Sequence, residues 1–503
     1  MVETELKFQI PAVRRAAVMR AVGTARATTL AMRAFYVDTP DRRLAAAGLA
    51  LRLRLEGRRW VQTVKGRGDG MFSRLEHEMV VARPAAGQQP VIDPALHDGT
   101  VAGDALRAAL DDRGESLQVL FETDVRRTQR VVRSGKSMIE LALDVGTLRA
   151  GNAQAPICEL EFELLRGDLV DATALAARWV DRFDLWLDIR SKAQRGDQLA
   201  RGAAAGPVVA ASVSGVLPAQ SPDAALRGIV ADCLRHLLPN AAEVGAGCAQ
   251  IEHLHQLRVA MRRLRSGLRV FGAWSPAVEP GWQSTLAAAF NELGAARDRD
   301  MLAESLLPAL RAAGAPLAEL PPSVAIDRPG DAIRSRAWNR LLLDLVTFAN
   351  GAAGPGDQTA PRRGVRRLAQ ERATLADQVT PLLKRMRRRL EKDAKQFVLL
   401  DAAARHQARK RLKRLRYSIE FVAPLFPPKA TSRYLVVVRK AQDAIGLLHD
   451  VTVADVLFRE LVSRDPRAWF AIGWLAARRA ELLPAAADAL AALAAEPPCW
   501  RRR

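Results

Sequence analysis

Charged and apolar side chains alternate with a period of two along several short segments in the first 200 residues. Residues 51–55 read LRLRL, so an extended backbone places both arginines on one face and the three leucines on the other. Residues 3–7 (ETELK) and 159–163 (ELEFE) alternate in the same way, mostly with glutamates. This period is typical of β-strands. We therefore expect short strands and a few helices in this part of the chain.

The pattern changes after residues 203–222, which are small, mostly uncharged and punctuated by proline. This composition suits a linker. From residue 223 onwards, apolar residues recur at helical spacing in long segments rich in Ala, Leu and Arg. The sequence therefore predicts two domains, an α+β or barrel domain in residues 1–202 and an all-α domain in residues 223–500.

The charged faces of the predicted strands carry more ionic groups than a solvent-exposed surface requires. For any single strand, a face turned towards water explains the alternation equally well. Taken together, the charged faces favour a sheet that closes with its polar side inward and its apolar side covered by helices. Like charges crowded inside a barrel are costly unless ligands neutralise them. Phosphate oxygens would satisfy the bases and metal ions the carboxylates, which points to a metal–polyphosphate complex.

The net charge of +21 is concentrated in the helical part of the chain. Residues 1–200 contain 30 Lys and Arg against 27 Asp and Glu, whereas residues 201–503 contain 46 against 28. Such an excess on helices favours a polyanionic partner. The four cysteines are far apart, and the sequence shows no long uncharged apolar run and no signal peptide before the first charged segment. We therefore expect a cytoplasmic protein that does not contact membranes.

Five motifs, taken in order, resemble the CYTH domain of the triphosphate tunnel metalloenzymes. They are Glu-x-Glu-x-Lys at residues 3–7, Leu-Arg-Leu-Arg at 51–54, Thr-x-Lys-Gly at 63–66, Glu-x-Glu-x-Glu at 159–163 and Ser-Lys-x-x-Arg-Gly at 191–196. The resemblance covers about residues 1–200. It implies an eight-stranded antiparallel β-tunnel with flanking helices, which binds a linear triphosphate and one or two Mg²⁺ or Mn²⁺ ions.

The resemblance also implies roles for individual residues. The catalytic residues would be Glu3, Glu5 and Lys7. The metal ligands would be Glu3, Glu5, Asp144, Glu161 and Glu163, and further acidic residues of the lumen would be Glu76 and Glu78. The phosphate-binding residues would be Arg52, Arg54, Lys65, Arg126, Arg130 and Lys192. Structural alternatives stay open for two of them, because Asp144 could cap a turn and Lys192 could be an ordinary surface lysine.

The expected chemistry is phosphoryl transfer to water, in which positioning and electrostatics matter more than a nucleophilic side chain. A metal ion would polarise the terminal phosphoryl group, a carboxylate of the Glu3–Glu5 pair would orient or deprotonate water, and basic residues would stabilise the leaving pyrophosphate. The favoured function is an inorganic triphosphatase that converts tripolyphosphate into pyrophosphate and phosphate. The alternatives are a thiamine or nucleoside triphosphatase, an adenylate cyclase of the same superfamily, and a non-catalytic polyanion-binding protein.

A basic motif occurs twice in the helical part of the chain. In each copy a histidine and three basic residues stand at i, i+3, i+7 and i+10, which forms one stripe along a helix. The two stripes are His255, Arg258, Arg262 and Arg265, and His406, Arg409, Lys413 and Arg416. A second marker follows each copy, at residues 293–298 and 445–450. The repetition predicts an internally duplicated helical bundle whose two stripes bind one linear polyanion.

The duplicated pattern is similar to CHAD domains, which are helical modules often fused to CYTH domains. The likeness covers about residues 223–500 and implies binding of inorganic polyphosphate through the basic face. Either stripe alone could instead be a solvated helix face. The helical part lacks the aromatic stacking platforms of single-strand binders, which argues against nucleic acid as a partner. The expected partners are therefore tripolyphosphate and long-chain polyphosphate, and association with polyphosphate granules in the cytoplasm is predicted.

Overall fold

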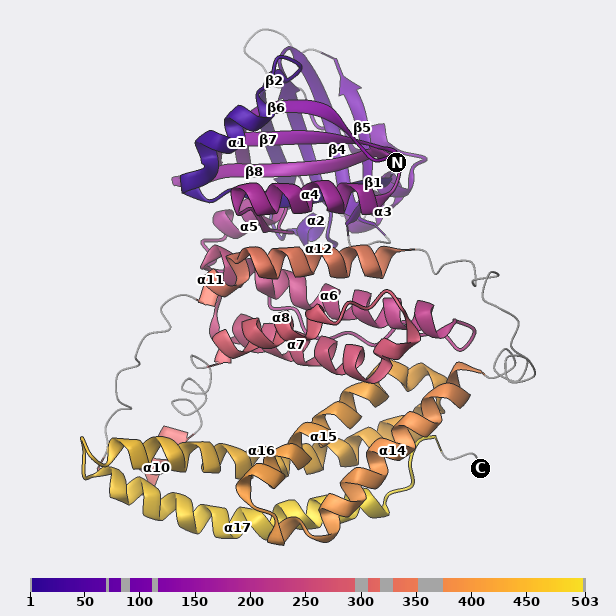
Figure 1. Ribbon diagram of the computed structural model, residues 1–503. Helices are drawn as coiled ribbons and strands as arrows, with labels where there is room; N and C mark the ends of the chain where they lie inside the picture. Colours follow the sequence, from indigo (N-terminus) through magenta and orange to yellow (C-terminus); the bar gives the residue numbers. More distant parts are fainter. Residues whose placement is uncertain are drawn as a thin grey trace. The chain divides into compact units, whose positions relative to one another are not determined.

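The computed structural model describes residues 2–68, 72–82, 91–110, 116–294, 306–316, 329–351 and 374–500 (Figure 1). These residues belong to two compact units. The first unit comprises Met1–Val209, Leu237–Leu257 and Arg328–Asn350, and the second comprises Ala210–His236, Arg258–Asp327 and Gly351–Arg503. Parts of the chain that follow residue 223 therefore contribute to both units.

Eight antiparallel strands form the tunnel of the first unit (Figure 1). Their order is β5-β4-β3-β2-β6-β7-β8-β1, and β1 also pairs with β5, so these strands close on themselves. The strands are β1 (Val2–Gln9), β2 (Thr28–Asp38), β3 (Ala50–Glu56), β4 (Arg59–Arg67), β5 (Ser73–Val81), β6 (Gln118–Ser134), β7 (Ser137–Ala150) and β8 (Ala153–Arg166). A two-residue strand, β9 (Trp186–Leu187), adds to β1. This architecture confirms the antiparallel tunnel that the sequence predicted.

Apolar side chains on the outer face of the sheet pack against a helix. Phe8 on β1 and Phe162 on β8 are fully buried, and their rings meet edge to face with centroids 5.4 Å apart. Trp179 of α4 (Leu169–Phe183) lies against Phe162, with a centroid distance of 6.0 Å. Burying one phenylalanine side chain contributes roughly 1.5–3 kcal/mol. This packing turns the apolar positions of β1 and β8 outward and their charged positions inward.

The other short helices of the tunnel segment, by which we mean residues 2–209, lie between its strands, except the last of them, which follows β9. They are η1 (Ala12–Arg14), α1 (Arg15–Val22), α2 (Arg43–Ala46), η2 (Pro94–His97), α3 (Val101–Leu110) and α5 (Lys192–Ala200). The start of α5 is well defined, because Ser191 forms a capping box with Gln194. This cap fixes the backbone of Lys192, the first residue of the helix.

Two helices from the later part of the chain pack on the tunnel segment within the first unit. They are α11 (Pro329–Arg334) and α12 (Arg336–Asn350). The hydroxyl groups of Thr347 on α12 and Thr173 on α4 are 2.7 Å apart. Trp338 of α12 is fully buried. The first unit is thus a β-tunnel with helical additions from far along the sequence.

Residues 203–222, predicted as a linker, contain neither helix nor strand before α6 (Pro222–Ala246) begins. Within the first unit, the side chain of Asn240 on α6 forms two hydrogen bonds with the backbone of Val209. Its Oδ1 accepts from the Val209 amide at 3.3 Å, and its Nδ2 donates to the Val209 carbonyl at 2.8 Å. The first part of the connection is therefore held by specific hydrogen bonds.

The helical part repeats one order of elements. Helices α7 (Ile251–Phe271) and α15 (Ala402–Val422) each contain 21 residues. Each is followed by a three-residue 3-10 helix, η3 (Gly272–Trp274) or η6 (Ala423–Leu425), and then by a further helix, α8 (Gly281–Glu292) or α16 (Pro428–Leu461). This order agrees with the internal duplication predicted from the basic motif.

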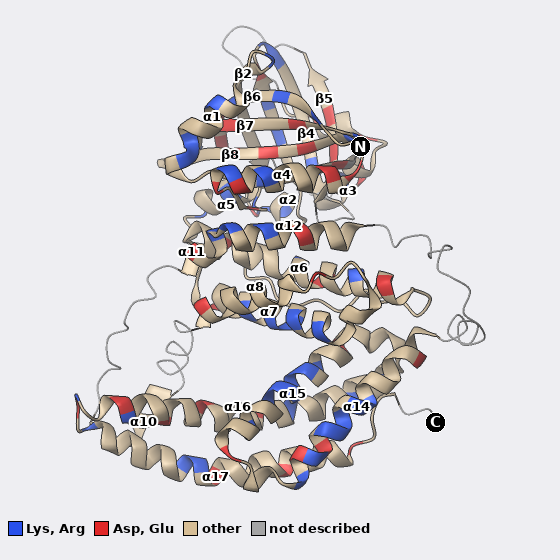
Figure 2. Ribbon diagram, in the orientation of Figure 1, with Lys and Arg blue, Asp and Glu red and all other residues tan. Residues whose placement is uncertain are grey.

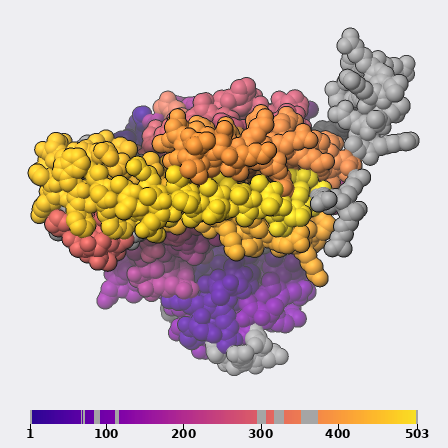
Figure 3. Space-filling model, turned by 90° about the horizontal axis from the view of Figure 1, so that it is seen from below, coloured from indigo at the N-terminus to yellow at the C-terminus, as the bar shows by residue number. Residues whose placement is uncertain are grey.

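The remaining described helices of the second unit are α10 (Leu307–Ala312), α14 (Leu375–Lys395), η5 (Phe397–Leu399) and α17 (Ala468–Ala495). Figure 3 shows α17, in yellow, running beside α14 along one face of this unit. Phe458 of α16 packs with Ile472 and Leu475 of α17 in a buried apolar cluster. No helix within the described ranges is long and apolar enough to cross a membrane.

Candidate functional site

The charged side chains of the tunnel strands lie on its concave face. Lys65 on β4 is 3.1 Å from Glu3 on β1, and Arg127 on β6 is 2.6 Å from Glu161 on β8, although neither pair of strands is adjacent in the sheet. Side chains reach across an intervening strand only on the concave side. The predicted residues on this face, joined by ion pairs or by register, are Glu3, Glu5, Lys7, Arg52, Arg54, Lys65, Glu76, Glu78, Asp144, Glu161 and Glu163.

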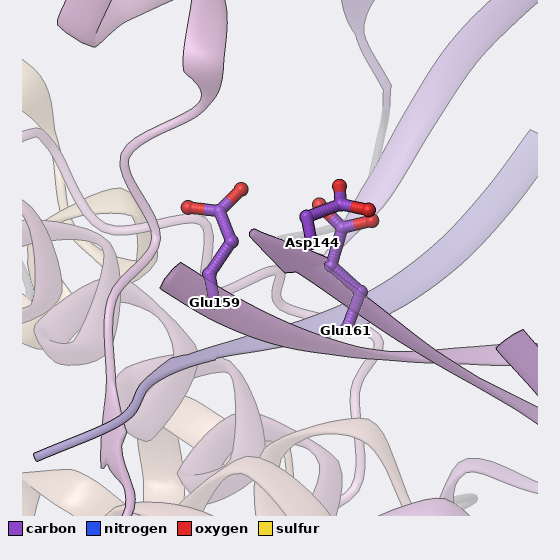
Figure 4. A group of neighbouring side chains, drawn as sticks. All are labelled: Asp144, Glu159 and Glu161. Carbon is purple, nitrogen blue, oxygen red and sulfur yellow. The ribbon is translucent and has the colours of Figure 1, made fainter. Parts of the chain in front are cut away.

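Three carboxylates gather around the amino group of Lys192. Oxygens of Asp144 on β7 and of Glu159 and Glu161 on β8 lie within 4.8 Å of one another (Figure 4). Lys192 Nζ is 2.7 Å from Asp144, 2.5 Å from Glu159 and 2.8 Å from Glu161. Arg127 adds a second cation, 2.7 Å from Asp144. Lys192 is therefore a residue of the lumen, and Asp144 faces cations there.

These cations decide the ionisation of the cluster. Burial by itself would raise the pKa of Asp144 and of Glu161. The charges of Lys192 and Arg127 outweigh burial, so the pKa of each carboxyl is lowered. The pKa of Lys192 is in turn raised by the three carboxylates, against the effect of its own burial. Asp144 and Glu161 are therefore carboxylates, and Lys192 is an ammonium, at neutral pH.

A second group of acids surrounds Lys65, whose Nζ is 3.1 Å from Glu3 and 2.7 Å from Glu76. Burial and a hydrogen bond with Glu3 raise the pKa of Glu76 to about 8. Burial and the charge of Glu3 raise the pKa of Glu163 to about 7. Burial also acts to raise the pKa of Glu3, but Glu76 and Lys65 lower it to about 2. Glu3 is therefore anionic at neutral pH, while Glu76 carries a proton.

Arg52 and Arg54 on β3 share one carboxylate, that of Glu78 on β5. Their Nη2 atoms lie 3.7 and 3.2 Å from Glu78 Oε1, which also accepts from the Thr63 hydroxyl at 3.1 Å. The Nε atoms of both arginines are buried and have no hydrogen-bond partner in the described structure. Burial lowers the pKa of Arg54, and the charge of Arg52 lowers it further. Additional anionic oxygens would stabilise this pair of guanidinium groups.

Lys7 of β1 is buried, with 4% of its surface exposed. Its ammonium donates to the carbonyl oxygen of Arg190. Burial lowers the pKa of Lys7, and the charges of Glu159 and Asp188 act in the opposite direction. Lys7 stands opposite Glu161 in the register of β1 and β8. Its amino group is thus held beside the carboxylates of the lumen.

Strand β6 corrects one part of the sequence interpretation. Arg127 faces the lumen, where it stands opposite Asp144 in the register. Arg126 is exposed, and Arg130 donates to the carbonyl of Ala21 in α1 at 3.1 Å. The placement of Arg126 and Arg130 inside the tunnel was therefore wrong by one residue. The segment carries arginine at both parities, so alternation alone could not choose between the faces.

The sequence interpretation also missed Arg74 on β5, which lies 3.3 Å from Glu5. A usable signal existed in this case, because Arg74 shares its parity with Glu76 and Glu78. Glu159, which was not among the predicted metal ligands, belongs to the Asp144 cluster. Register, rather than residue type, assigns both residues to the lumen.

Cations of both repeats converge in the second unit, and Figure 2 shows Lys and Arg gathered along α7 and α15. We call Arg262 of α7 together with Arg409, Lys413 and Arg416 of α15 the Lys413 cluster. Burial lowers the pKa of Lys413, and the charges of Arg262, Arg409 and Arg416 lower it further, to about 6, although Asp450 acts in the opposite direction. Arg409 lies 3.8 Å from Asp450 and Arg416 lies 3.2 Å from Glu420, so carboxylates pair with two of these four cations.

Aromatic rings and one ion pair hold the basic helices in place. The guanidinium groups of Arg258, Arg262 and Arg265 lie 4.3, 5.9 and 5.8 Å from the centre of the Phe290 ring. Arg263 forms an ion pair with Glu420 that joins α7 to α15. The structure thus brings predicted stripe residues from the two repeats together, and their binding of polyphosphate stays a prediction.

The histidines of the two stripes differ in their surroundings. His406 stacks on His449 of α16 with ring centroids 4.8 Å apart. Burial lowers the pKa of His406, and the charges of Lys410 and Arg409 lower it further. His255 belongs to the first unit and so is not compared with His406 in space. Residues 295–298, part of the predicted second marker, lie outside the described residues.

A closed antiparallel tunnel lined by acids and bases, joined to a duplicated set of basic helices, defines the architectural class of this protein. The model of the CYTH domain matches residues 1–181, and the model of the CHAD domain matches residues 228–459. The chain therefore contains a CYTH domain followed by a CHAD domain, as the sequence motifs implied.

The similar proteins each match one part of the chain. An inorganic triphosphatase from Haemophilus influenzae is 31% identical over 167 residues, which are 32% of this chain and 44% of that protein. The match thus spans less than half of that relative. The crystal structure of the CHAD domain from Ricinus communis is 29% identical, with a TM-score of 0.46, and the match covers 58% of this chain and 98% of that one. An adenylyl cyclase candidate from Hippeastrum with a dominant triphosphatase activity is 17% identical, with a TM-score of 0.29, over 40% of this chain and 96% of that one.

Proposed function

We propose that this protein is a metal-dependent inorganic triphosphatase, which hydrolyses tripolyphosphate to pyrophosphate and phosphate in its tunnel and binds polyphosphate through its CHAD region. The observation that carries this proposal is the lining of the closed tunnel, where buried carboxylates alternate with lysines and arginines. A small inorganic chain of phosphates needs charge on all sides and no apolar pocket. The tunnel lining meets that need along several strands.

The phosphate-binding groups of the proposal are Lys7, Arg52, Arg54, Lys65, Arg127 and Lys192. Each is a cation of the lumen, and each lies near at least one carboxylate in register or by ion pair. Phosphate oxygens compete for the same donors. Among the described residues, the Nε atoms of Arg52 and Arg54 have no hydrogen-bond partner, so they lose no existing hydrogen bond when an anion binds.

The donor set fits a hard divalent cation, because carboxylate oxygens are the ligands that Mg²⁺ and Mn²⁺ prefer. Asp144, Glu159 and Glu161 have oxygens close enough to share one ion, and Glu3, Glu5 and Glu163 are further candidates. When bound, such an ion compensates the charge of the terminal phosphoryl group and polarises it. Lys192 now lies among the first three carboxylates, so its ammonium competes with a metal ion for them.

The chain's own residues would then direct the water. Glu3 is anionic at neutral pH, since its pKa is lowered to about 2 by Glu76 and Lys65 against the effect of burial. A carboxylate in that state accepts a hydrogen bond from water and so orients it for attack. Lysine and arginine side chains stabilise the pyrophosphate that leaves.

Substrate competition tests this proposal. Turnover of tripolyphosphate, thiamine triphosphate and ATP by the full-length protein is measured with Mg²⁺, with Mn²⁺ and with EDTA. We expect tripolyphosphate to be preferred and EDTA to abolish turnover. A large preference for ATP or for thiamine triphosphate would identify a nucleoside or thiamine triphosphatase, and formation of cyclic AMP would identify an adenylate cyclase. Absence of all turnover, with polyphosphate still bound, would leave a polyanion-binding protein.

A second measurement addresses the CHAD region. Long-chain polyphosphate and duplex DNA compete for the full-length protein at a stated salt concentration, because affinity for polyanions depends steeply on salt. We expect polyphosphate to displace DNA. Stronger binding of DNA would contradict the assigned partner.

A further inference from the structure

One short loop holds two lysines of the lumen. The lysine loop, our name for residues Trp186–Lys192, begins with β9 and ends at the first residue of α5. The carbonyl of Arg190 in this loop accepts a hydrogen bond from the ammonium of Lys7. The amide of Asp188 donates to the carbonyl of Lys7 at 3.0 Å. Lys192, at the end of the loop, lies among three carboxylates. The path of this loop therefore sets the positions of both amino groups.

A side chain of α12 forms a hydrogen bond with the backbone of the lysine loop. Helix α12 lies within the CHAD region, residues 228–459. Asn339 Oδ1 accepts from the Leu187 amide at 2.8 Å, and both residues are buried. The Nδ2 of Asn339 donates to the carbonyls of Ile333 at 3.0 Å and Ser335 at 2.9 Å, which fixes the orientation of the side-chain amide. A buried amide N–H without an acceptor is costly. The hydrogen bond therefore ties the loop to α12.

Helix α6 makes a second set of contacts with the loop. Glu243 is 4% exposed, and its carboxylate accepts from Arg190 Nη1 at 3.5 Å. The same guanidinium donates to the two carboxylate oxygens of Asp188, at 3.0 and 2.8 Å. Gly245 lies so close to Trp186 that an added Cβ would stand 3.0 Å from the indole ring. Helix α6 thus contacts the loop at its beginning and near its end.

We propose that Asn339 and Glu243 are positioning residues for Lys7 and Lys192, and that they act through the lysine loop. The effect on catalysis rests on the proposed function, whereas the placement of the lysines does not. On this proposal the CHAD region is part of the scaffold of the tunnel as well as a module for polyanions. If either of these contacts is lost, the loop moves away from β1, and the ammonium of Lys7 loses the carbonyl of Arg190 that accepts its hydrogen bond.

Four variants of the full-length chain separate this role from general packing. Asn339→Ala removes every hydrogen bond of the side chain. Asn339→Asp keeps an acceptor for the Leu187 amide but loses the two donors. Glu243→Gln keeps the size of the side chain and removes its charge. Arg336→Ala is the matched control, because Arg336 lies on the same helix and pairs with Asp184 of the tunnel segment at 2.6 Å rather than with the lysine loop.

The first measurement does not depend on activity. Each protein is treated briefly with acetic anhydride, and acetylation of Lys7 is quantified by peptide mass spectrometry against Lys384, which is exposed. We expect labelling of Lys7 to rise about tenfold in Asn339→Ala and several-fold in Glu243→Gln, because local opening exposes the amino group. Arg336→Ala should match the wild type, and Asn339→Asp should stay closer to it than Asn339→Ala does.

The second measurement is turnover of tripolyphosphate. Misplacing a reacting group by about 1 Å can cost about 100-fold in rate, so we expect kcat to fall about 10- to 100-fold in Asn339→Ala with a smaller change in KM. Arg336→Ala should retain the kcat of the wild type.

Equal labelling of Lys7 in all four variants would overturn the proposal. So would equal effects of Asn339→Ala and Asn339→Asp, because the bonds inside α11 and α12 would then explain both. If Asn339→Ala does not fold, Glu243→Gln provides the same comparison. If the wild type does not hydrolyse tripolyphosphate, the proposed function fails, and the labelling experiment still decides the placement of Lys7.

Discussion

The tunnel and the Lys413 cluster both contain lysines and arginines, but the charged neighbours of their lysines differ. In the tunnel, each lysine or arginine of the lumen lies near carboxylates, as Lys192 does with three of them. In the cluster, Lys413 faces arginines from both repeats, and its pKa is lowered to about 6 by burial and by their charges. Paired charges hold a defined geometry, whereas crowded like charges are relieved by loss of a proton or by a bound anion. On the proposed function, the tunnel is the site of hydrolysis and the Lys413 cluster recruits the polyanion.

The largest expected effect separates the function of the tunnel from that of the CHAD region, because only turnover should be lost. Replacing Glu3 and Glu5 together with glutamine removes two carboxylates that the proposal assigns to metal binding and to the orientation of water. Turnover of tripolyphosphate should fall by about 10³-fold or more, since removal of single electrostatic groups in active sites costs about 10²–10³. Binding of long polyphosphate, measured by fluorescence anisotropy, should be unchanged. Preserved turnover would refute the assignment.

The next prediction compares neighbouring arginines on β6. Arg127→Ala removes a cation that contacts Asp144 and Glu161, and it should lower kcat/KM about 10- to 100-fold, as expected when a charge-assisted hydrogen bond is lost. Arg126→Ala changes an exposed side chain of the outer face and should alter kcat/KM less than about twofold. Steady-state kinetics decides between them. A larger loss for Arg126→Ala would mean that the register of β6 is wrong.

A third prediction concerns pH and the CHAD region. With a pKa of about 6, Lys413 is neutral at pH 8 and gains a proton as the pH falls. A bound polyanion favours the protonated form, so affinity for polyphosphate should be about tenfold higher at pH 6 than at pH 8. The variant Lys413→Arg stays charged and serves as the control, with binding that depends less on pH. Identical pH profiles for the two proteins would exclude Lys413 as the group that titrates.

The smallest effect is expected at the stripe histidine. Burial and neighbouring cations lower the pKa of His406, so it is neutral at pH 7 and adds no charge to the surface. His406→Gln should therefore change polyphosphate affinity less than about threefold, whereas Arg416→Gln removes a charge and should weaken binding about tenfold. Isothermal titration at pH 7 measures both. Equal losses would show that the histidine contacts the ligand directly.

The strands differed in how well their charged faces could be predicted from the sequence. On β1, β3 and β8 the charges share one parity and the other parity is apolar, so Lys7, Arg54 and Glu161 were placed correctly inside the tunnel. Strand β6 has arginines at adjacent positions, and its hydrophobic residues do not decide the parity. Only its pairing with β7 places Arg127 opposite Asp144.

The basic helices show a similar division. Helical spacing identified the two stripes, because period and repetition are properties of the chain itself. The depressed pKa of Lys413 could not be inferred in this way, since it requires Arg262 from a different helix to lie nearby. Long-range packing alone supplies that contact.

The sequence by itself determined the two architectures, the order of their motifs and the residue types that meet in the lumen. It could do so because alternation and helical periodicity depend only on the spacing of residues that are close together in the chain. The tertiary structure decided which arginine of β6 turns inward, and it placed the amino group of Lys192 among three carboxylates. It also brought Asn339 and Glu243 to a loop more than fifty residues away in the chain. These facts depend on strand register and on packing between distant segments, and no local pattern encodes them.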